Sequence, residues 1–275
     1  MGYATLMVHL DLRKSNAGLL KVTAELAARF GSAVIGIVAC QPIQIAYGDG
    51  YFPGAMEEED HGQKIREMRA AEEEFRAALS PTTRQLEWRA DITTEPLRDH
   101  HARAARAADL IVTHMDTSRL LDQTRHFNIG DLILRAGRPV LVVPPDADRL
   151  VLDRAFIAWK DTREARRAAS DALPLLAAAG HVIVAEVAPE SHLPAAREGL
   201  AEVVAWLSRH GVAAEALAVP PVGPDADSLA RLAAVQSADV IIAGAYGHGR
   251  LREWVLGGVT LDLLLSAPRF AFLSH

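Results

Sequence analysis

The stretch FIAWKD, residues 156–161, has the pattern of a buried strand that closes on an aspartate. The same pattern occurs earlier, because ATLMVHLD at residues 4–11 is also a short apolar run that ends in an aspartate. A helical pattern follows each run, from Ser15 to Phe30 in the first case and from about Arg163 to Ala179 in the second. The chain is therefore predicted to contain two copies of one structural unit.

The later apolar runs repeat in the same order. Residues 32–39 correspond to 181–188, 107–116 to 237–246, and 136–144 to 267–275. The period of roughly 130–150 residues is far longer than a solenoid repeat. Strands that alternate with helices indicate a parallel sheet covered on both faces, which explains why the strands are continuously apolar.

These patterns predict an α/β fold with two tandem doubly wound domains, each with a five-stranded parallel sheet and helices on both faces. We expect the first domain at residues 1–146 and the second at 151–275. A short polar linker that contains Pro144, Pro145, Asp146 and Asp148 separates them.

Composition excludes several classes of function. The formal net charge of −6 over 275 residues provides no basic face for nucleic acid. No run approaches the length of a membrane span, and the N-terminus lacks a basic region followed by a long apolar segment. The single cysteine, Cys40, lies in an apolar run and is interpreted as a buried structural thiol. A cytoplasmic protein that neither spans a membrane nor is exported is expected.

The first half contains a segment that the second half lacks. Residues 41–55, QPIQIAYGDGYFPGA, predict a loop, and the charged residues 56–79 predict a helix with a solvated face. The loop is either a lid or an insertion that covers the sheet edge or the other half, and the sequence leaves both interpretations open.

A glycine-rich stretch, AGAYGHGRLREWVLGGVT at residues 243–260, follows the fourth strand of the second half. Glycines directly after a buried strand indicate a close backbone approach. The approaching group is either an anion, which the start of the next helix attracts, or another part of the protein.

The spacing of Gly244, Gly247 and Gly257, with Asp161 at the end of the first strand of that half, resembles the nucleotide-binding motif of the universal stress protein family. The resemblance covers the whole chain as two tandem domains. It implies an adenine nucleotide alpha hydrolase-like fold and a bound adenine nucleotide, ATP or AMP, with magnesium accompanying the nucleotide.

The resemblance also assigns roles to residues of the second half. Asp161 contacts the ribose or adenosine part, and Val187 offers an apolar surface and backbone groups to adenine. The ribose side and the phosphates are implied to contact Ala243, Gly244, Gly247, His248, Gly257, Gly258, Val259 and Thr260. Glycine suits a phosphate cradle because no Cβ atom obstructs the backbone N–H donors.

Two departures from the family's motif matter. The family usually has Ser, Thr or Asn after the third glycine, where this chain has Gly258. A lost hydrogen bond to a charged group costs roughly 1.5–3 kcal/mol, which is about tenfold in affinity or more. The first half keeps Asp11 but has Thr113 and Asp116 in place of the glycine pair and only Gly130 near the third glycine. It is interpreted as a degenerate site with a structural role, joined to the second half through the last strands.

Other polar residues are assigned structural places. Adjacent residues on a helix point in different directions, so His100 and His101 are interpreted as surface histidines and not as metal ligands. His114 and His126 flank the degenerate loop and are interpreted as loop polarity. Trp159 is predicted to be a core residue.

Three functions follow in order of preference. The first is a universal stress protein that binds an adenine nucleotide in its second domain and acts in the stress response through partner proteins. The second is an interaction module that binds no nucleotide, and the third is a slow ATPase, for which the sequence offers no evident catalytic group. The protein is either a monomer that mimics a family dimer or a homodimer.

Overall fold

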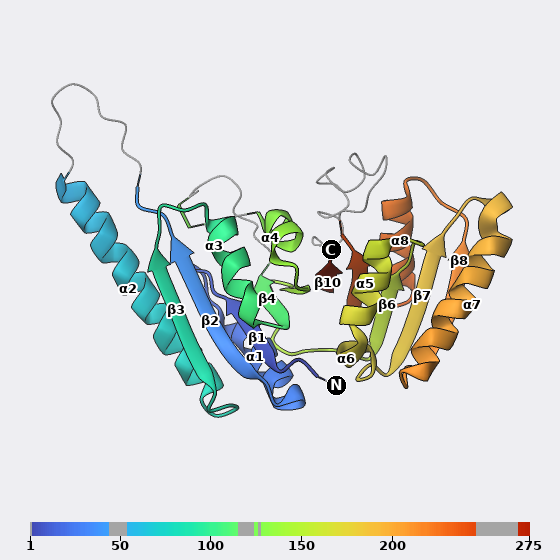
Figure 1. Ribbon diagram of the computed structural model, residues 1–275, viewed down its shortest axis with the longest axis horizontal. Helices are drawn as coiled ribbons and strands as arrows, with labels where there is room; N and C mark the ends of the chain where they lie inside the picture. The colour runs from blue at the N-terminus through green and yellow to red at the C-terminus, as the bar shows by residue number, and fades with distance from the viewer. Residues whose placement is uncertain (1, 44–53, 115–123, 126–127, 246–268) are drawn as a thin grey trace, which may run out of the picture.

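The computed structural model describes residues 2–43, 54–114, 124–125, 128–245 and 269–275 (Figure 1). The strands of the first half are β1 (Thr5–His9), β2 (Ala33–Cys40), β3 (Leu86–Ile92), β4 (Leu110–His114) and β5 (Val140–Val143). Its helices are α1 (Ala17–Phe30), α2 (Gly54–Leu79), α3 (Leu97–Ala104), the 3₁₀ turn η1 (Ala105–Ala107) and α4 (Ile129–Ala136).

The second half repeats this alternation. Its strands are β6 (Arg154–Ala158), β7 (His181–Val187), β8 (Ala214–Val219), β9 (Val240–Gly244) and β10 (Phe270–Ser274). Its described helices are α5 (Arg163–Asp171), α6 (Leu173–Leu176), the 3₁₀ turn η2 (Glu190–His192), α7 (Leu193–Arg209) and α8 (Asp225–Val235). Each apolar run named from the sequence forms a strand, which confirms the predicted fold class.

The ten strands among the described residues form one sheet in the order β3-β2-β1-β4-β5-β10-β9-β6-β7-β8. Pairing is parallel within each half, while β5 and β10 pair antiparallel, with Ala271 opposite Val142. This confirms that the two halves join through their last strands. The junction covers one edge of each five-stranded sheet, since an unpaired edge would otherwise expose backbone donors and acceptors.

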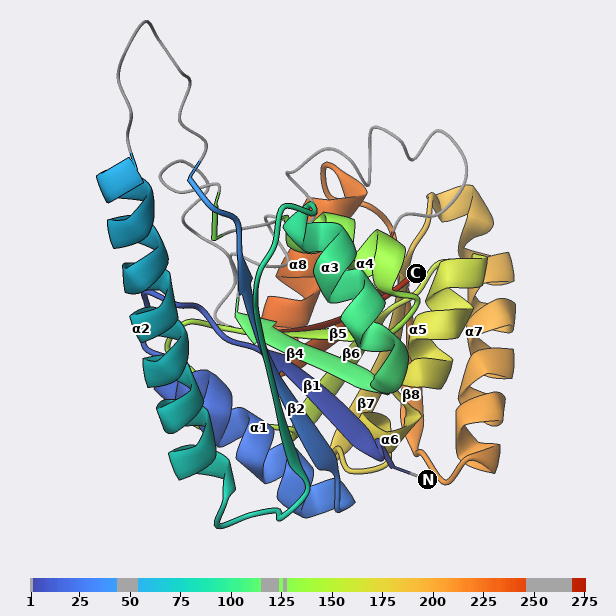
Figure 2. The ribbon, with the colours of Figure 1, turned by 60° about the vertical axis from the view of Figure 1, so that its left-hand side comes forward.

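Helices cover both faces of this sheet (Figures 1 and 2). The largest buried cluster lies under α1, α2, α5, α6 and α7, and two smaller clusters lie under α3, η1, α4 and α8 on the other face. The largest cluster contains Leu6 and Val8 of β1 together with Phe270 and Phe272 of β10, so the two halves share a core. Trp159 is 7% exposed and Cys40 is fully buried, which confirms both as core residues.

One predicted helix is shorter than expected. The pattern from Arg163 to Ala179 predicts a single helix, but α5 ends at Asp171 and a separate short turn, α6, follows. Pro174 explains the break, because proline has no N–H to bond the carbonyl four residues earlier and is tolerated only in a first helical turn.

The connection between the halves packs against the first half. The Leu150 N–H donates to the Glu25 carboxylate at 2.7 Å, and the side chains of Leu150 and Leu152 are buried. Within the described ranges, no helix is both long and apolar enough to cross a membrane.

Candidate ligand-binding site

Four of the residues singled out from the sequence lie at one edge of the second half. Strand order reverses between β6 and β9, which are neighbours with Ala158 opposite Ala243. Asp161 follows β6, Gly244 ends β9, and Val187 ends β7 on the other side of β6. Open parallel sheets bind ligands outside the carboxyl ends of the strands at such a reversal.

The remaining site residues lie outside the described residues. They are Gly247, His248, Gly257, Gly258, Val259 and Thr260. Their assignment to ribose and phosphates stays a prediction.

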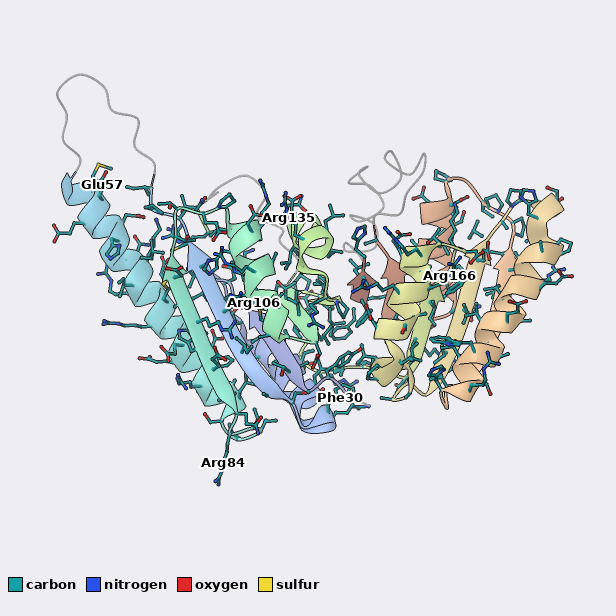
Figure 3. The ribbon with its side chains drawn as sticks, viewed as in Figure 1. Phe30, Glu57, Arg84, Arg106, Arg135 and Arg166 are labelled. Carbon is teal, nitrogen blue, oxygen red and sulfur yellow. The ribbon has the colours of Figure 1, made fainter. Side chains whose placement is uncertain are left out.

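Asp161 is open to solvent, with 77% of its side chain exposed. Its carboxylate accepts hydrogen bonds from Nε and Nη2 of Arg166 at 3.2 and 2.8 Å. Arg166 lies on α5 (Figure 3), and 59% of its side chain is exposed. Exposed ion pairs contribute about 0–1 kcal/mol, so a ligand that bonds Asp161 displaces Arg166 at little cost.

Glu186 is a second carboxyl group at this edge, and the sequence interpretation missed it. Burial and the charge of Asp161 raise the pKa of Glu186, while the Lys160 ammonium opposes them. The available signal was a single acidic residue in the apolar run HVIVAEVA, directly before Val187. Two carboxyl groups therefore lie near each other where the adenosine part is predicted.

Ala243 and Gly244 are packed by the protein itself. The Ala243 side chain is 6% exposed and belongs to the core. A Cβ atom added to Gly244 would lie 2.5 Å from both the backbone nitrogen of Ala165 and the carbonyl carbon of Glu164. For this glycine, the close backbone approach is to the first turn of α5.

That first turn already has partners for its donors. The Thr162 hydroxyl accepts a hydrogen bond from the Ala165 N–H at 3.3 Å, as helix caps do. Burial favours protonation of Glu164, but its own backbone N–H and the Arg163 guanidinium outweigh burial and hold its pKa below the ordinary range. Two backbone donors of this turn, the N–H groups of Glu164 and Ala165, are thus bonded within the turn.

The corresponding edge of the first half is organised around Asn16. Its Oδ1 accepts from the Asp11 N–H and its Nδ2 donates to the Asp11 carbonyl, both at 2.9 Å. Glu74 of α2 accepts from the Asn16 N–H at 3.1 Å. The Asp11 carboxylate accepts from the Arg13 N–H at 2.9 Å and pairs with Lys14 at 3.5 Å. The loop after β1 is thus held by α2.

Glu67 of α2 links this loop to the segment between β4 and α4. Its Oε1 lies 3.5 Å from Nε of Arg13, and its Oε2 accepts from Nε of Arg125 at 2.9 Å. The Arg125 side chain is only 3% exposed. In the first half, ion pairs of the protein therefore tie the connection after β1 to the connection after β4.

The strand ends of the first half carry a further polar contact. Thr113 at the end of β4 is buried, and its hydroxyl lies 3.1 Å from Nδ1 of His9 on β1. The His9 ring meets the His101 ring edge-on, with centroids 4.8 Å apart.

The interpretation of His101 as a surface residue was wrong, because it is fully buried on the inner side of α3. Its Nδ1 lies 2.7 Å from the Leu97 carbonyl oxygen. Because a carbonyl can only accept, this contact assigns the ring proton to Nδ1, which donates it. Burial and, next, the nearby His9 lower its pKa well below the ordinary value. His100 is also largely covered, with 16% of its side chain exposed. His126 lies outside the described residues.

Solved structures with the same fold include proteins of matching length. The chain resembles a universal stress protein from Archaeoglobus fulgidus DSM 4304, with a TM-score of 0.72, 14% sequence identity, and coverage of 98% of this chain and 95% of that one. It also resembles a functionally unknown protein from Pseudomonas aeruginosa PAO1, with a TM-score of 0.57, 15% identity, and coverage of 99% and 92%. No protein-family model and no curated protein matches the sequence. The similarity confirms the universal stress protein fold over both halves.

Proposed function

We propose that this chain is a cytoplasmic tandem universal stress protein whose second half binds an adenine nucleotide and whose occupancy changes its contacts with partner proteins. The nucleotide lies outside the carboxyl ends of β6, β7 and β9. Asp161 and Val187 contact its adenosine part, and the segment after Gly244 contacts its phosphates.

The position of Asp161 supports the proposal most. It follows β6 at the strand-order reversal, next to the end of β9, and its carboxylate is exposed and forms a weak surface pair with Arg166. An ionised carboxylate accepts hydrogen bonds, as the donation of ribose hydroxyls would require. The first half, by contrast, binds Asp11 and the neighbouring loop through Asn16 and α2.

A thermal shift titration with ATP and magnesium, and separately with AMP, tests the proposal on the full chain. A ligand that binds only the native state at 100 times its Kd stabilises it by about 2.7 kcal/mol. For a chain of this size that corresponds to a Tm rise of roughly 5–11 °C. Asp161→Ala and Gly247→Val should each abolish most of this rise.

Asp11→Ala is the matched control, because it changes the corresponding aspartate of the half that lacks the glycine motif. This variant should keep the full ligand-dependent rise, whatever its own Tm. An equal loss in the Asp11 and Asp161 variants would place the nucleotide elsewhere.

A second candidate function is an interaction module without a nucleotide. The contact between Gly244 and the first turn of α5 favours it, because packing alone explains that glycine. A flat response to ATP and AMP at millimolar concentration, in a protein that unfolds cooperatively, would decide for this candidate.

A further inference from the structure

The outer strand β3 directs half of its backbone groups away from the sheet. In its parallel ladder with β2, the Gln85 carbonyl accepts from the Val34 N–H, and the Thr93 N–H donates to the Cys40 carbonyl, both at 2.9 Å. The backbone N–H and C=O groups of the odd-numbered residues of β3 therefore bond to β2. The residues whose N–H and C=O groups face the open edge are Leu86, Trp88, Ala90 and Ile92.

Two cavities follow the seam between α2 and this edge. One has a volume of about 560 Å³ and the other about 580 Å³, and both are lined by His61 and Ile92. The smaller cavity is walled largely by apolar side chains of α2 and of β3 itself, which are Ile65, Met68, Trp88, Ala90 and Ile92. In Figure 2, α2 lies on the same side of the sheet as α1, next to β3, where Phe75 of α2 packs on Trp88. A strand placed on β3 would therefore direct alternate side chains into this cavity.

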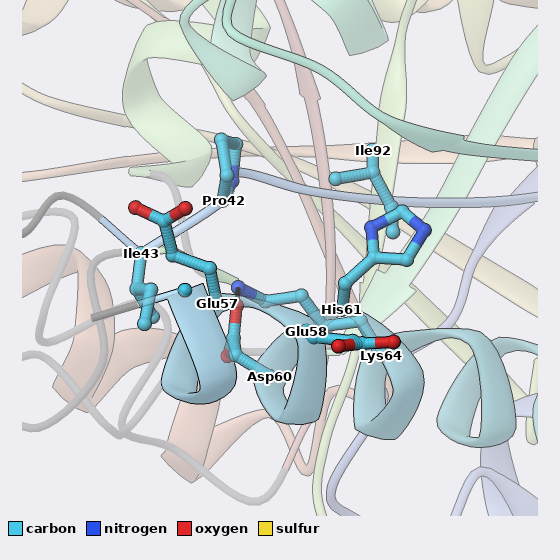
Figure 4. Close-up of a pocket in the computed structure, with 9 residues that line it drawn as sticks. Pro42, Ile43, Glu57, Glu58, Asp60, His61, Lys64 and Ile92 are labelled. Atoms are coloured by element: carbon cyan, nitrogen blue, oxygen red, sulfur yellow. Dashed lines mark hydrogen bonds and ion pairs between the residues drawn. The ribbon is translucent and has the colours of Figure 1, made fainter. Parts of the chain in front are cut away.

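The larger cavity has an acidic wall (Figure 4). Among the described residues that line it, three carry carboxylates, Glu57, Glu58 and Asp60, and one carries an ammonium group, the fully buried Lys64, which pairs with Asp60. Negative charge therefore exceeds positive charge along the described lining of the larger cavity, and this excess suits a cationic side chain.

We propose that an extended, basic segment of a partner protein adds to β3 as a further strand. Its main chain pairs with the outward groups of residues 86–92, its apolar side chains enter the smaller cavity, and a lysine or arginine lies against Glu58 and Asp60. A second copy of this chain fits less well, because its own α2 would meet this α2 at the edge. The site is separate from the nucleotide edge of the second half and does not depend on it.

Hydrogen exchange by NMR, with a capped peptide of alternating lysine and valine as the probe, tests the proposal on the full chain. The amides of Trp88, Ala90 and Ile92 should exchange rapidly in the free protein and become protected when the peptide binds. Those of Arg89 and Asp91 are bonded to β2 and should be protected in both states.

Proline substitutions at the two outer strands provide a matched pair. Ala90→Pro removes one outward N–H and places a ring at the open edge, so it should weaken peptide binding about tenfold or more while β3 stays paired with β2. On the other outer strand, the Val219 carbonyl accepts from Ala188, so the exposed Ala216 also faces outward. Ala216→Pro should leave peptide binding unchanged.

Glu58→Lys is a second variant, on the exposed surface of α2, that should weaken binding of the lysine peptide several-fold. Equal binding of a peptide of alternating glutamate and valine would overturn the basic partner. Absence of protection at Trp88, Ala90 and Ile92 with either peptide, or unchanged binding by Ala90→Pro, would overturn strand addition. Protection of these amides in the free protein, together with a doubled mass by light scattering, would assign the edge to a second copy instead.

Discussion

Replacing Gly244 by alanine tests whether the first glycine of the motif serves packing. The added Cβ would lie 2.5 Å from the Ala165 nitrogen and the Glu164 carbonyl carbon and 2.8 Å from the Glu164 carbonyl oxygen. All three are backbone atoms at the start of α5, so no side chain can rotate out of the way. Either β9 or the first turn of α5 has to move by about 1 Å to restore ordinary contact distances.

Such overpacking typically costs about 1–3 kcal/mol. We expect the upper half of this range, because the displaced turn carries the Thr162 cap and the Arg163–Glu164 ion pair. With about 2–4 °C per kcal/mol for a chain of this size, the Tm should fall by roughly 4–12 °C.

The assay is thermal and urea unfolding of the ligand-free protein, followed by far-UV circular dichroism. Gly199→Ala is the matched control, since Gly199 lies inside α7 and an added Cβ meets nothing within 4 Å. Alanine is a better helix former than glycine by about 1 kcal/mol, so this variant should be stabilised. The same chemical change is thus expected to act with opposite signs at the two positions.

Unchanged stability of Gly244→Ala, with Gly199→Ala stabilised, would refute the packing argument. It would show that α5 and β9 separate easily and that the glycine is needed only when a ligand is present. A loss of ATP stabilisation in Gly244→Ala without a loss of intrinsic stability would have the same meaning.

Three further predictions follow from buried groups of the first half. Glu67→Ala removes the carboxylate that pairs with the buried Arg125, and it should lower the free energy of unfolding, measured in urea, by about 3 kcal/mol. Glu73→Ala, on the exposed face of α2, is the control and should change this free energy by less than about 0.5 kcal/mol. Burial lowers the pKa of His101 in the folded state, so below a pH of about 6.5 the unfolded chain binds a proton that the folded chain does not. The free energy of unfolding should therefore fall by about 1.4 kcal/mol per pH unit as the pH drops below about 6.5. A shallower pH dependence in His101→Phe would identify this residue as the cause. Burial raises the pKa of the Cys40 thiol to about 11, so a thiol reagent at pH 8 should label the native protein only as fast as it unfolds; rapid labelling without denaturant would contradict the buried position.

Several features of this protein could be predicted from its sequence. Strands buried on both faces must be continuously apolar, so runs such as residues 181–188 identify themselves. Their order with the intervening helical patterns restricts the topology to a doubly wound parallel sheet in each half. Asp11 and Asp161 could be placed at the carboxyl edge of each sheet, because each ends the first apolar run of its half. These features depend on residues close together in the chain.

Other features depend on contacts between distant residues, and only the tertiary structure decided them. Glu67 is one of many charged residues on α2, and nothing local distinguishes it from Glu73 until the fold brings Arg13 and Arg125 to it. His101 looked like a surface residue because its burial depends on how α3 packs over β1.

Gly244 shows the boundary between the two kinds of information. Its place after a buried strand predicted a close backbone approach, and this prediction is confirmed. The identity of the approaching group, the first turn of α5, depends on the crossing of two elements that lie some eighty residues apart in the chain. Local patterns fix where the backbone must be free of a side chain, whereas only the packed fold fixes which group fills that space.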